Sequence, residues 1–223
     1  MDESMITIYT GFDPREQYGW HTFASSVMHR TREAVAFVPL SGPQRNGSNA
    51  FTYARFMVPF LSRHRGWAIF ADACDMVCRA DISELFDLQD HAYAVQVVKH
   101  DYKTMYPQKY VGTEMESPNV DYHRKNWASL MLINCEHPAW RRLDMADMIS
   151  SPGQDLLRFA FLNDHEIGEL PRVWNWLADE DGENDSAKIV HWTTGIPAFQ
   201  HYADAPMADV WAAEALRVTH VAK

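Results

Sequence analysis

The stretch that decides the fold runs from Gly66 to Asp81 and reads GWAIFADACDMVCRAD. Its apolar run, residues 67–71, stops at Asp72, and Asp75 follows three residues later. A short apolar run bounded by polar residues is typical of a buried strand. Acids that end such a strand lie where α/β proteins bind ligands, and two of them can hold a divalent cation that binds a diphosphate. The alternative is that Asp72 caps the following turn and Asp75 is only solvated.

Length and composition indicate one folded domain. The chain has 223 residues, of which 47% are hydrophobic and 22% charged, so we expect residues 1–223 to form a single domain. A net charge of -10 argues against a nucleic-acid-binding surface. Three cysteines form no disulfide framework, the acidic N-terminus does not read as a signal peptide, and no run is long enough for a transmembrane segment. These features favour a soluble, cytoplasmic protein.

Strand-like and helix-like segments alternate along the chain. Short runs rich in β-branched or apolar residues predict strands at 5–9, 35–38, 67–71, 93–98, 129–134 and 189–191. Helical spacing predicts helices over 15–30, 51–61, 138–148, 156–162 and 206–218, with one helical turn at 81–86. Residues 41–49 and 99–124 are expected to be irregular, and the second stretch is long enough to suggest a functional loop. The alternation favours an α/β fold with a mostly parallel sheet.

Several segments, in this order, resemble glycosyltransferase family 8 and its relatives. They are the turn 9–13 after the first strand, FTYARFMVPFL at 51–61, the strand that ends in acids, SLMLIN at 129–134 and HWTTGIPAF at 191–199. The resemblance runs from about Ile6 to Tyr202. It implies the GT-A fold, a single Rossmann-like domain with a central, mostly parallel mixed sheet flanked by helices. It also implies nucleotide-diphosphate-sugar donors, Mn²⁺ and retention of the anomeric configuration.

The metal motif of that family is Asp-x-Asp, whereas this chain has one more residue between Asp72 and Asp75. A β-bulge or a tighter turn would absorb the extra residue. Otherwise one acid binds the metal directly, and the other acts through water or on the ribose. The resemblance also matches His191 to the late histidine of the family. We therefore expect Asp72, Asp75 and His191 to bind Mn²⁺, which suits imidazole better than Mg²⁺ does, although Mg²⁺ stays possible.

One charge of the family pattern is missing. The family places a lysine before the proline of its late motif, and this chain has Ile196 there. A cation that would help to hold the leaving diphosphate is therefore absent from this position. Lys188, Lys125 and Lys99 are the candidates to replace it.

The resemblance also implies residues that contact the donor base. Tyr9, Thr10, Gly11 and Asp13 match the base-binding turn after the first strand. Main-chain groups and an acid in such a turn can read the edge of uracil or guanine by hydrogen bonds, and Tyr9 or Phe12 can stack on the ring. The alternative is an ordinary strand-to-helix turn that Asp13 caps.

Further residues are assigned to the phosphates and to the sugar. Arg55 matches an arginine that faces the donor, and its guanidinium suits a phosphate, although an exposed helical salt bridge would explain it equally well. Asp72 is counted with the donor-binding residues as well as with the metal ligands. Asp164 falls where the family has a loop acid beside the sugar, so it is the candidate to recognise the sugar or to stabilise charge at the anomeric carbon.

These assignments lead to a metal-dependent hexosyltransferase that uses a nucleotide-diphosphate sugar, with UDP-sugars favoured, and a hydroxyl acceptor on a glycan or another molecule. An alternative is a nucleotide-sugar-binding module that has lost transfer, or one domain of a larger transferase. A metal-dependent nucleotide-sugar hydrolase or nucleotidyltransferase would share the same acids. The donor sugar, the acceptor and the oligomeric state cannot be derived from the sequence.

Overall fold

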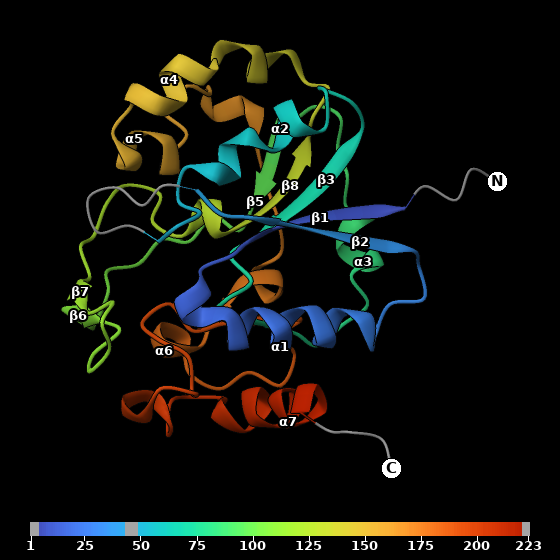
Figure 1. The fold of residues 1–223 in the computed structure, drawn as a ribbon. Helices are drawn as coiled ribbons and strands as arrows, with labels where there is room; N and C mark the ends of the chain where they lie inside the picture. The colour runs from blue at the N-terminus through green and yellow to red at the C-terminus, as the bar shows by residue number, and fades with distance from the viewer. Residues whose placement is uncertain (1–4, 43–48, 220–223) are drawn as a thin grey trace.

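A six-stranded sheet forms the centre of the computed structural model, which describes residues 5–42 and 49–219 (Figure 1). The strands lie in the order β2-β1-β3-β8-β5-β9. The two pairs that involve β8 are antiparallel and the other three are parallel, so the sheet is mixed and mostly parallel, as predicted. The strands are β1 (Ile6–Gly11), β2 (Val35–Leu40), β3 (Trp67–Ala71), β5 (Val95–Val97), β8 (Leu130–Asn134) and β9 (Ile167–Glu169).

The central strands are apolar on both faces because each face carries its own hydrophobic core. Along β3, Ala68 and Phe70 belong to one core, and Ile69 and Ala71 belong to the other. This alternation follows from the period of two in a strand. A strand with both faces covered reads as a continuous apolar run, which explains the pattern that predicted it.

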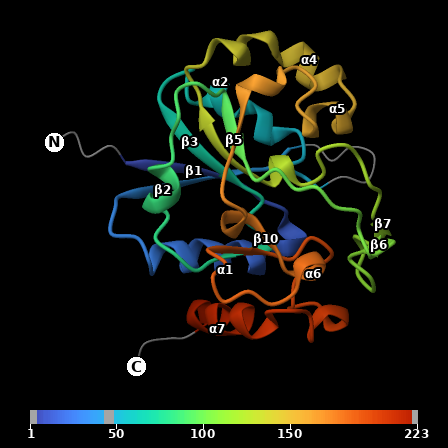
Figure 2. The same cartoon turned by 180° about the vertical axis from the view of Figure 1, so that it is seen from behind.

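Helices cover both faces of the sheet (Figures 1 and 2). Phe23 and Val27 of α1 join the core that contains Ile69, whereas α2, α4 and α5 cover the opposite face. On its outer side α1 packs against α7, where the Tyr18 and Trp211 rings meet edge to face at 5.3 Å. The helices are α1 (Gln17–Met28), α2 (Val58–Leu61), α3 (Ser83–Phe86), α4 (Met145–Ser150), α5 (Gly153–Leu157), α6 (Ala178–Asp181) and α7 (Ala208–Thr219).

A second sheet of three short strands joins the late part of the chain to the acidic turn. Its order is β10-β11-β4, with β10 (Trp176–Leu177), β11 (Ile189–His191) and β4 (Met76–Cys78). Strand β4 was not expected from the sequence. It pairs antiparallel with β11 so that Met76 lies opposite His191, and Trp192 N donates to Asp75 O at 2.9 Å. The histidine and the acid therefore meet through backbone pairing.

The remaining ordered elements are short. The irregular stretch 99–124 contains a small hairpin of β6 (Gln108–Lys109) and β7 (Ser117–Pro118). Residues 43–48 of the predicted loop 41–49 lie outside the described residues. Within the described part, no helix is both long and apolar enough to span a bilayer. The 3-10 helices are η1 (Pro14–Glu16), η2 (Ala54–Met57), η3 (Trp127–Ser129), η4 (Pro138–Arg142), η5 (Asp164–Glu166), η6 (Arg172–Asn175) and η7 (Gln200–Tyr202).

Two helix predictions have wrong bounds. The segment 138–148 forms η4 and then α4 in place of one helix, because Asp144 leaves the helical conformation and caps α4, accepting from Asp147 N at 2.7 Å. The helix expected over 156–162 lies earlier, as α5. It ends before Phe159, whose φ of 55° lies in the left-handed region. The predicted helix 51–61 is helical in its second half, as η2 followed by α2.

The first prediction concerns Gly19, where α1 passes closest to the acidic turn. A Cβ atom at this position would lie 1.8 Å from the carbonyl oxygen of Cys74. We expect Gly19→Ala to lower the free energy of unfolding by about 1–3 kcal/mol or more, because helix and turn must separate to admit the methyl group. Urea unfolding measures the change. Gly42→Ala is the control, since its Cβ would meet no atom closer than 3.5 Å. Equal losses in the two variants would contradict this packing.

Candidate active site

The acidic turn absorbs its extra residue by tightening. Cys74 N donates to Asp72 O at 2.6 Å, and Ala73 adopts a φ of 60° in the left-handed region. The chain therefore turns tightly within residues 72–75, between β3 and β4. Of the two solutions considered for the extra residue, a bulge and a tighter turn, the structure uses the turn.

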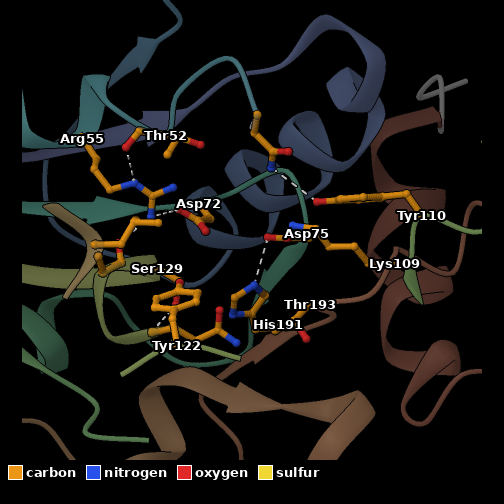
Figure 3. Close-up of a pocket in the computed structure, with 14 residues that line it drawn as sticks. Thr52, Arg55, Asp72, Asp75, Lys109, Tyr110, Tyr122, Ser129, His191 and Thr193 are labelled. Atoms are coloured by element: carbon orange, nitrogen blue, oxygen red, sulfur yellow. Dashed lines mark hydrogen bonds and ion pairs between the residues drawn. The ribbon is translucent and has the colours of Figure 1, made fainter. Parts of the chain in front are cut away.

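The turn and β11 bring Asp72, Asp75 and His191 together at one side of a pocket (Figure 3). One potential ligand atom from each residue lies within 4.8 Å of the other two. Ligands on opposite sides of a divalent ion, with bonds of about 2.0–2.6 Å, lie roughly 4–5 Å apart. Asp75 Oδ1 is buried and has no hydrogen-bond partner among the described residues. An unpaired buried carboxylate oxygen beside an imidazole is a donor set that fits a divalent cation.

Hydrogen bonds to the far side of the ring orient His191. Asn175 Nδ2 donates to Ser129 Oγ at 2.8 Å, which turns Asn175 Oδ1 toward His191 Nδ1 at 3.0 Å. In the neutral imidazole Nδ1 then carries the proton, and the lone pair of Nε2 faces Asp75 Oδ1 at 3.3 Å. A second partner of this kind fixes the tautomer and the direction of a metal-binding histidine.

Burial and close charges change the proton affinities of these groups. Burial raises the pKa of Asp72 to about 6, with Arg55 opposing the rise and Asp75 adding to it. For His191, burial disfavours the imidazolium, but the carboxylates of Asp75 and Asp72 outweigh it and raise the pKa above its ordinary value. Protons therefore compete with a metal ion for Asp72 and His191 near neutral pH.

Arg55 lies inside the pocket and supports Asp72. Its Nη1 lies 2.8 Å from Asp72 Oδ1 and donates to Ala128 O at 2.7 Å. The guanidinium lies between the rings of Phe51 and Phe70, at 5.5 and 5.1 Å from their centroids. The side chain is buried, so the exposed salt bridge considered from the sequence is not what the structure contains. The position of Arg55 instead fixes the carboxylate of Asp72.

The pocket also contains residues that sequence reasoning missed. Lys109 and Tyr110 of the β6–β7 hairpin line the pocket and are drawn on the Asp75 side of it in Figure 3. Glu16 is buried nearby, and neither of its carboxylate oxygens has a hydrogen-bond partner among the described residues. Burial raises the pKa of Glu16 well above its usual range, and Asp75 adds to the rise. The described lining residues are Asn49, Thr52, Arg55, Asp72, Asp75, Lys109, Tyr110, Tyr122, Asn126, Ala128, Ser129, Leu157, His191 and Thr193.

The turn assigned to the base lies at the end of β1. Tyr9 and Thr10 are buried, and Trp20 Nε1 donates to Thr10 Oγ1 at 2.9 Å. At Gly11 a Cβ atom would lie 2.4 Å from the ring of Phe51, which explains a glycine there. Tyr9, Thr10 and Gly11 are not among the described residues that line the pocket.

Asp13 acts as a cap in this structure. It precedes η1, and its side chain accepts from Arg15 N at 3.1 Å and from Ala50 N at 3.3 Å. The guanidinium of Arg15 also pairs with it at 2.6 Å. The cap role, one of the two considered from the sequence, is therefore present, and recognition of a base stays a prediction.

Asp164 and Ile196 are not among the described residues that line the pocket. Asp164 is exposed and pairs with Arg124, and it does not line the pocket in the described part of the chain. Its role at the sugar stays a prediction. Ile196 is buried in a core with Trp192 and Trp211, so this position supplies no charge.

None of the three lysines proposed to replace the missing cation lines the pocket among the described residues. Lys188 pairs with Glu84 at 2.5 Å, and Lys99 lies 5.8 Å from the Trp127 ring centroid. Lys125 donates to Asn119 Oδ1 at 2.7 Å and lines a neighbouring cavity.

Comparison with known proteins identifies a family. No protein-family model matches the sequence. Protein CDI of Arabidopsis thaliana is 36% identical over 227 residues, which span 94% of this chain and 86% of Protein CDI. The chain belongs to the Protein CDI family.

Solved structures identify the fold. WbbM, a bifunctional glycosyltransferase, matches with a TM-score of 0.70 at 15% identity. The match covers 98% of this chain, which spans about half of WbbM (52%). The galactosyltransferase LgtC, solved with donor and acceptor sugar analogues, matches with a TM-score of 0.65 at 13% identity over 98% of each chain. GlyE of Streptococcus pneumoniae matches at 0.64 and 13% over 96% of this chain and 60% of its own. The GT-A fold expected from the resemblance to glycosyltransferase family 8 is confirmed.

The second prediction is that Mn²⁺ affinity rises with pH. Metal binding must displace protons from Asp72, whose pKa is about 6, and from His191, whose pKa is raised. Both groups bind protons more fully as the pH falls, so we expect calorimetric Mn²⁺ affinity to fall from about pH 8 to about pH 5, with protons released on binding. An affinity that stays constant over this range would contradict this set of ligands.

The third prediction concerns Asn175, which is fully buried and orients His191. We expect Asn175→Ala to weaken Mn²⁺ binding about 10- to 100-fold, because the imidazole loses the partner that fixes its tautomer. Asn184→Ala is the matched control, since its side chain accepts only from the nearby Ser186 N in the described structure. Circular dichroism checks that both variants fold. Unchanged Mn²⁺ affinity in a folded Asn175→Ala protein would contradict the assigned role.

Proposed function

We propose that this chain is a metal-dependent glycosyltransferase that transfers a hexosyl group from a nucleotide-diphosphate sugar, with UDP-sugars favoured, to a hydroxyl group of a glycan. The observation that carries the proposal is the set of three ligand atoms within 4.8 Å, from Asp72, Asp75 and His191, in a chain with the GT-A fold. LgtC, which shares that fold, is a galactosyltransferase solved with donor and acceptor sugar analogues.

Asp72, Asp75 and His191 would hold the cation. When bound, a divalent cation offsets the charge that develops on a departing nucleotide diphosphate. A set of two carboxylates and one imidazole favours Mn²⁺ over Mg²⁺, because imidazole is a softer ligand than oxygen. Arg55 keeps the carboxylate of Asp72 in place through its contact at 2.8 Å, and Asn175 keeps the ring of His191 in place.

The acceptor is proposed to enter through a neighbouring cavity. This cavity shares Lys109, Tyr122, Asn126, Leu157 and Thr193 with the pocket of the metal ligands, so the two spaces adjoin. A donor in one space and an acceptor hydroxyl in the other would be held close together, which is itself a large part of catalysis for a transfer between two substrates.

The roles of Tyr9, Thr10, Gly11 and Asp13 at the base and of Asp164 at the sugar belong to the proposal. Support for the first comes from the position of the turn at the end of β1, a central strand next to β3. For Asp164 the support is its pairing with Arg124, two residues before Asn126 of the pocket wall.

A reducing compartment, and with it a cytoplasmic location, is also proposed. All three cysteines are free and buried, as expected for a protein that does not rely on disulfides.

The fourth prediction tests this function by calorimetry. We expect UDP to bind much more tightly with Mn²⁺ than without it, because the ion links the acids to the diphosphate. Asp75→Ala should remove this dependence on Mn²⁺ while the protein stays folded by circular dichroism. If no nucleoside diphosphate binds, or if binding does not respond to Mn²⁺, the proposal is wrong. If Asp75→Ala unfolds the chain, the acid is structural.

A second measurement separates transfer from related activities. Incubation with radiolabelled UDP-sugars, Mn²⁺ and a set of glycans should yield a labelled glycan and UDP. Release of free sugar without a glycan product would indicate a hydrolase. Tight Mn²⁺-dependent binding without any product from the whole donor set would indicate a binding module.

A further inference from the structure

The side chain of Lys109 reaches the pocket from a hairpin that is fixed in place. Tyr110 N donates to Thr194 O at 2.6 Å, and Val111 N donates to the hydroxyl of Tyr202 at 2.9 Å. Asn49 Nδ2 donates to the Tyr110 hydroxyl at 3.3 Å. The first bond joins the hairpin to the loop that follows His191, the second joins it to η7, and the third joins it to Asn49. The position of Lys109 is therefore set by the same segment that supplies a metal ligand.

The ammonium group of Lys109 has no hydrogen bond or ion pair with any described residue. Its contact is with the ring of Tyr110, whose centroid lies 5.4 Å from Nζ. Burial lowers the pKa of Lys109, and the carboxylates of Asp75 and Glu16 act in the opposite direction. A lysine that served only to neutralise these acids would pair with one of them directly. Lys109 lies among the acids but leaves its donors available.

The charges of the pocket leave room for an anion. Asp72 and Asp75 supply two negative charges, which a divalent cation alone balances. Burial raises the pKa of Glu16 well above its ordinary value, and the charge of Asp75 adds to the rise. The guanidinium of Arg55 and the ammonium of Lys109 then remain as positive charge in a largely buried space. Such an excess disfavours an empty site and favours an anionic ligand.

Within the described pocket Lys109 is the cation with donors to spare. Arg55 already contacts Asp72 and donates to the carbonyl oxygens of Thr52 and Ala128. Ile196 is packed in a core and carries no charge. A diphosphate beside the acids would therefore find its available ammonium donors on the hairpin.

We propose that Lys109 binds the diphosphate of the nucleotide donor and offsets the charge that the diphosphate gains as the sugar leaves. This inference rests on the proposed function. In the transfer, the bond between the anomeric carbon and the diphosphate oxygen breaks, and its electron pair stays on that oxygen. The acceptor hydroxyl oxygen forms the new bond to the anomeric carbon, and its proton passes to the departing diphosphate oxygen. Lys109 stabilises the leaving diphosphate by charge-assisted hydrogen bonds and gains no bond itself.

The fifth prediction tests Lys109 by calorimetry, with UDP and with Mn²⁺ as separate probes. We expect Lys109→Met to weaken binding of UDP in the presence of Mn²⁺ by about 10- to 100-fold, the loss typical of one hydrogen bond between charged groups. Lys109→Arg should recover part of the affinity because it keeps the charge. Lys109→Met should bind Mn²⁺ without nucleotide at least as tightly as the parent chain, because a nearby cation is removed and no ligand is lost.

Lys188→Met is the matched control, since Lys188 pairs with Glu84 outside the pocket, and it should leave UDP binding unchanged. If the parent binds UDP with Mn²⁺ and Lys109→Met binds it equally well, the inference is wrong and the proposed function stands. If Lys109→Met loses Mn²⁺ binding or unfolds, Lys109 supports the acids structurally and the inference is also wrong. If the parent binds no UDP with Mn²⁺, the role of Lys109 is overturned together with the proposed use of UDP.

Discussion

Two like-charged carboxylates beside a buried imidazole are the constraint on which the site depends. Asp72 and Asp75 repel each other across a short turn, and burial adds to the cost of ionising them. The structure meets this cost with Arg55 against Asp72 and His191 against Asp75. Removing one partner of a buried ion pair typically costs about 3–5 kcal/mol, so the contact between Arg55 and Asp72 is strongly coupled to the fold. Arg55 opposes the rise that burial causes in the pKa of Asp72.

The same constraint explains why two sheets meet at this turn. β3 belongs to the central sheet and ends at Ala71, directly before Asp72, whereas β4 begins after Asp75 and belongs to the small sheet. β4 pairs with β11 in a register that places His191 opposite Met76. This pairing brings His191 next to the acids, although more than a hundred residues of sequence separate them. The close approach of α1 at Gly19 supports the turn from behind. The turn is therefore a junction of three packed elements, and its geometry does not depend on the turn sequence alone.

The sequence predicted the central fold because its signals are local. The apolar run of β3 matches the observed bounds, and the ordered motifs led to the GT-A fold and to three residues, Asp72, Asp75 and His191, that the structure brings together. Elements that depend on tertiary pairing were missed. The strand β4 has only three residues and gains its hydrogen bonds from β11, and the β6–β7 hairpin has no periodic pattern. Asn175 was not predicted as a site residue, because its bond to His191 exists only in the folded chain. Lys109 was missed for the same reason.

The different positions of Ile196 and Lys109 illustrate how charge and core packing compete in this site. Ile196 lies in the core that joins the small sheet to α7, and a charged side chain buried there without a partner would be costly. Lys109 of the hairpin lines the pocket, where burial lowers its pKa and the carboxylates of Asp75 and Glu16 oppose that change. Both segments are joined by the bond from Tyr110 N to Thr194 O, so a charge on the hairpin is as firmly placed as one on the late loop. What matters for a cation in this pocket is where it lies relative to the acids. A residue at a different position in the sequence, such as Lys109 in place of Ile196, can therefore supply it.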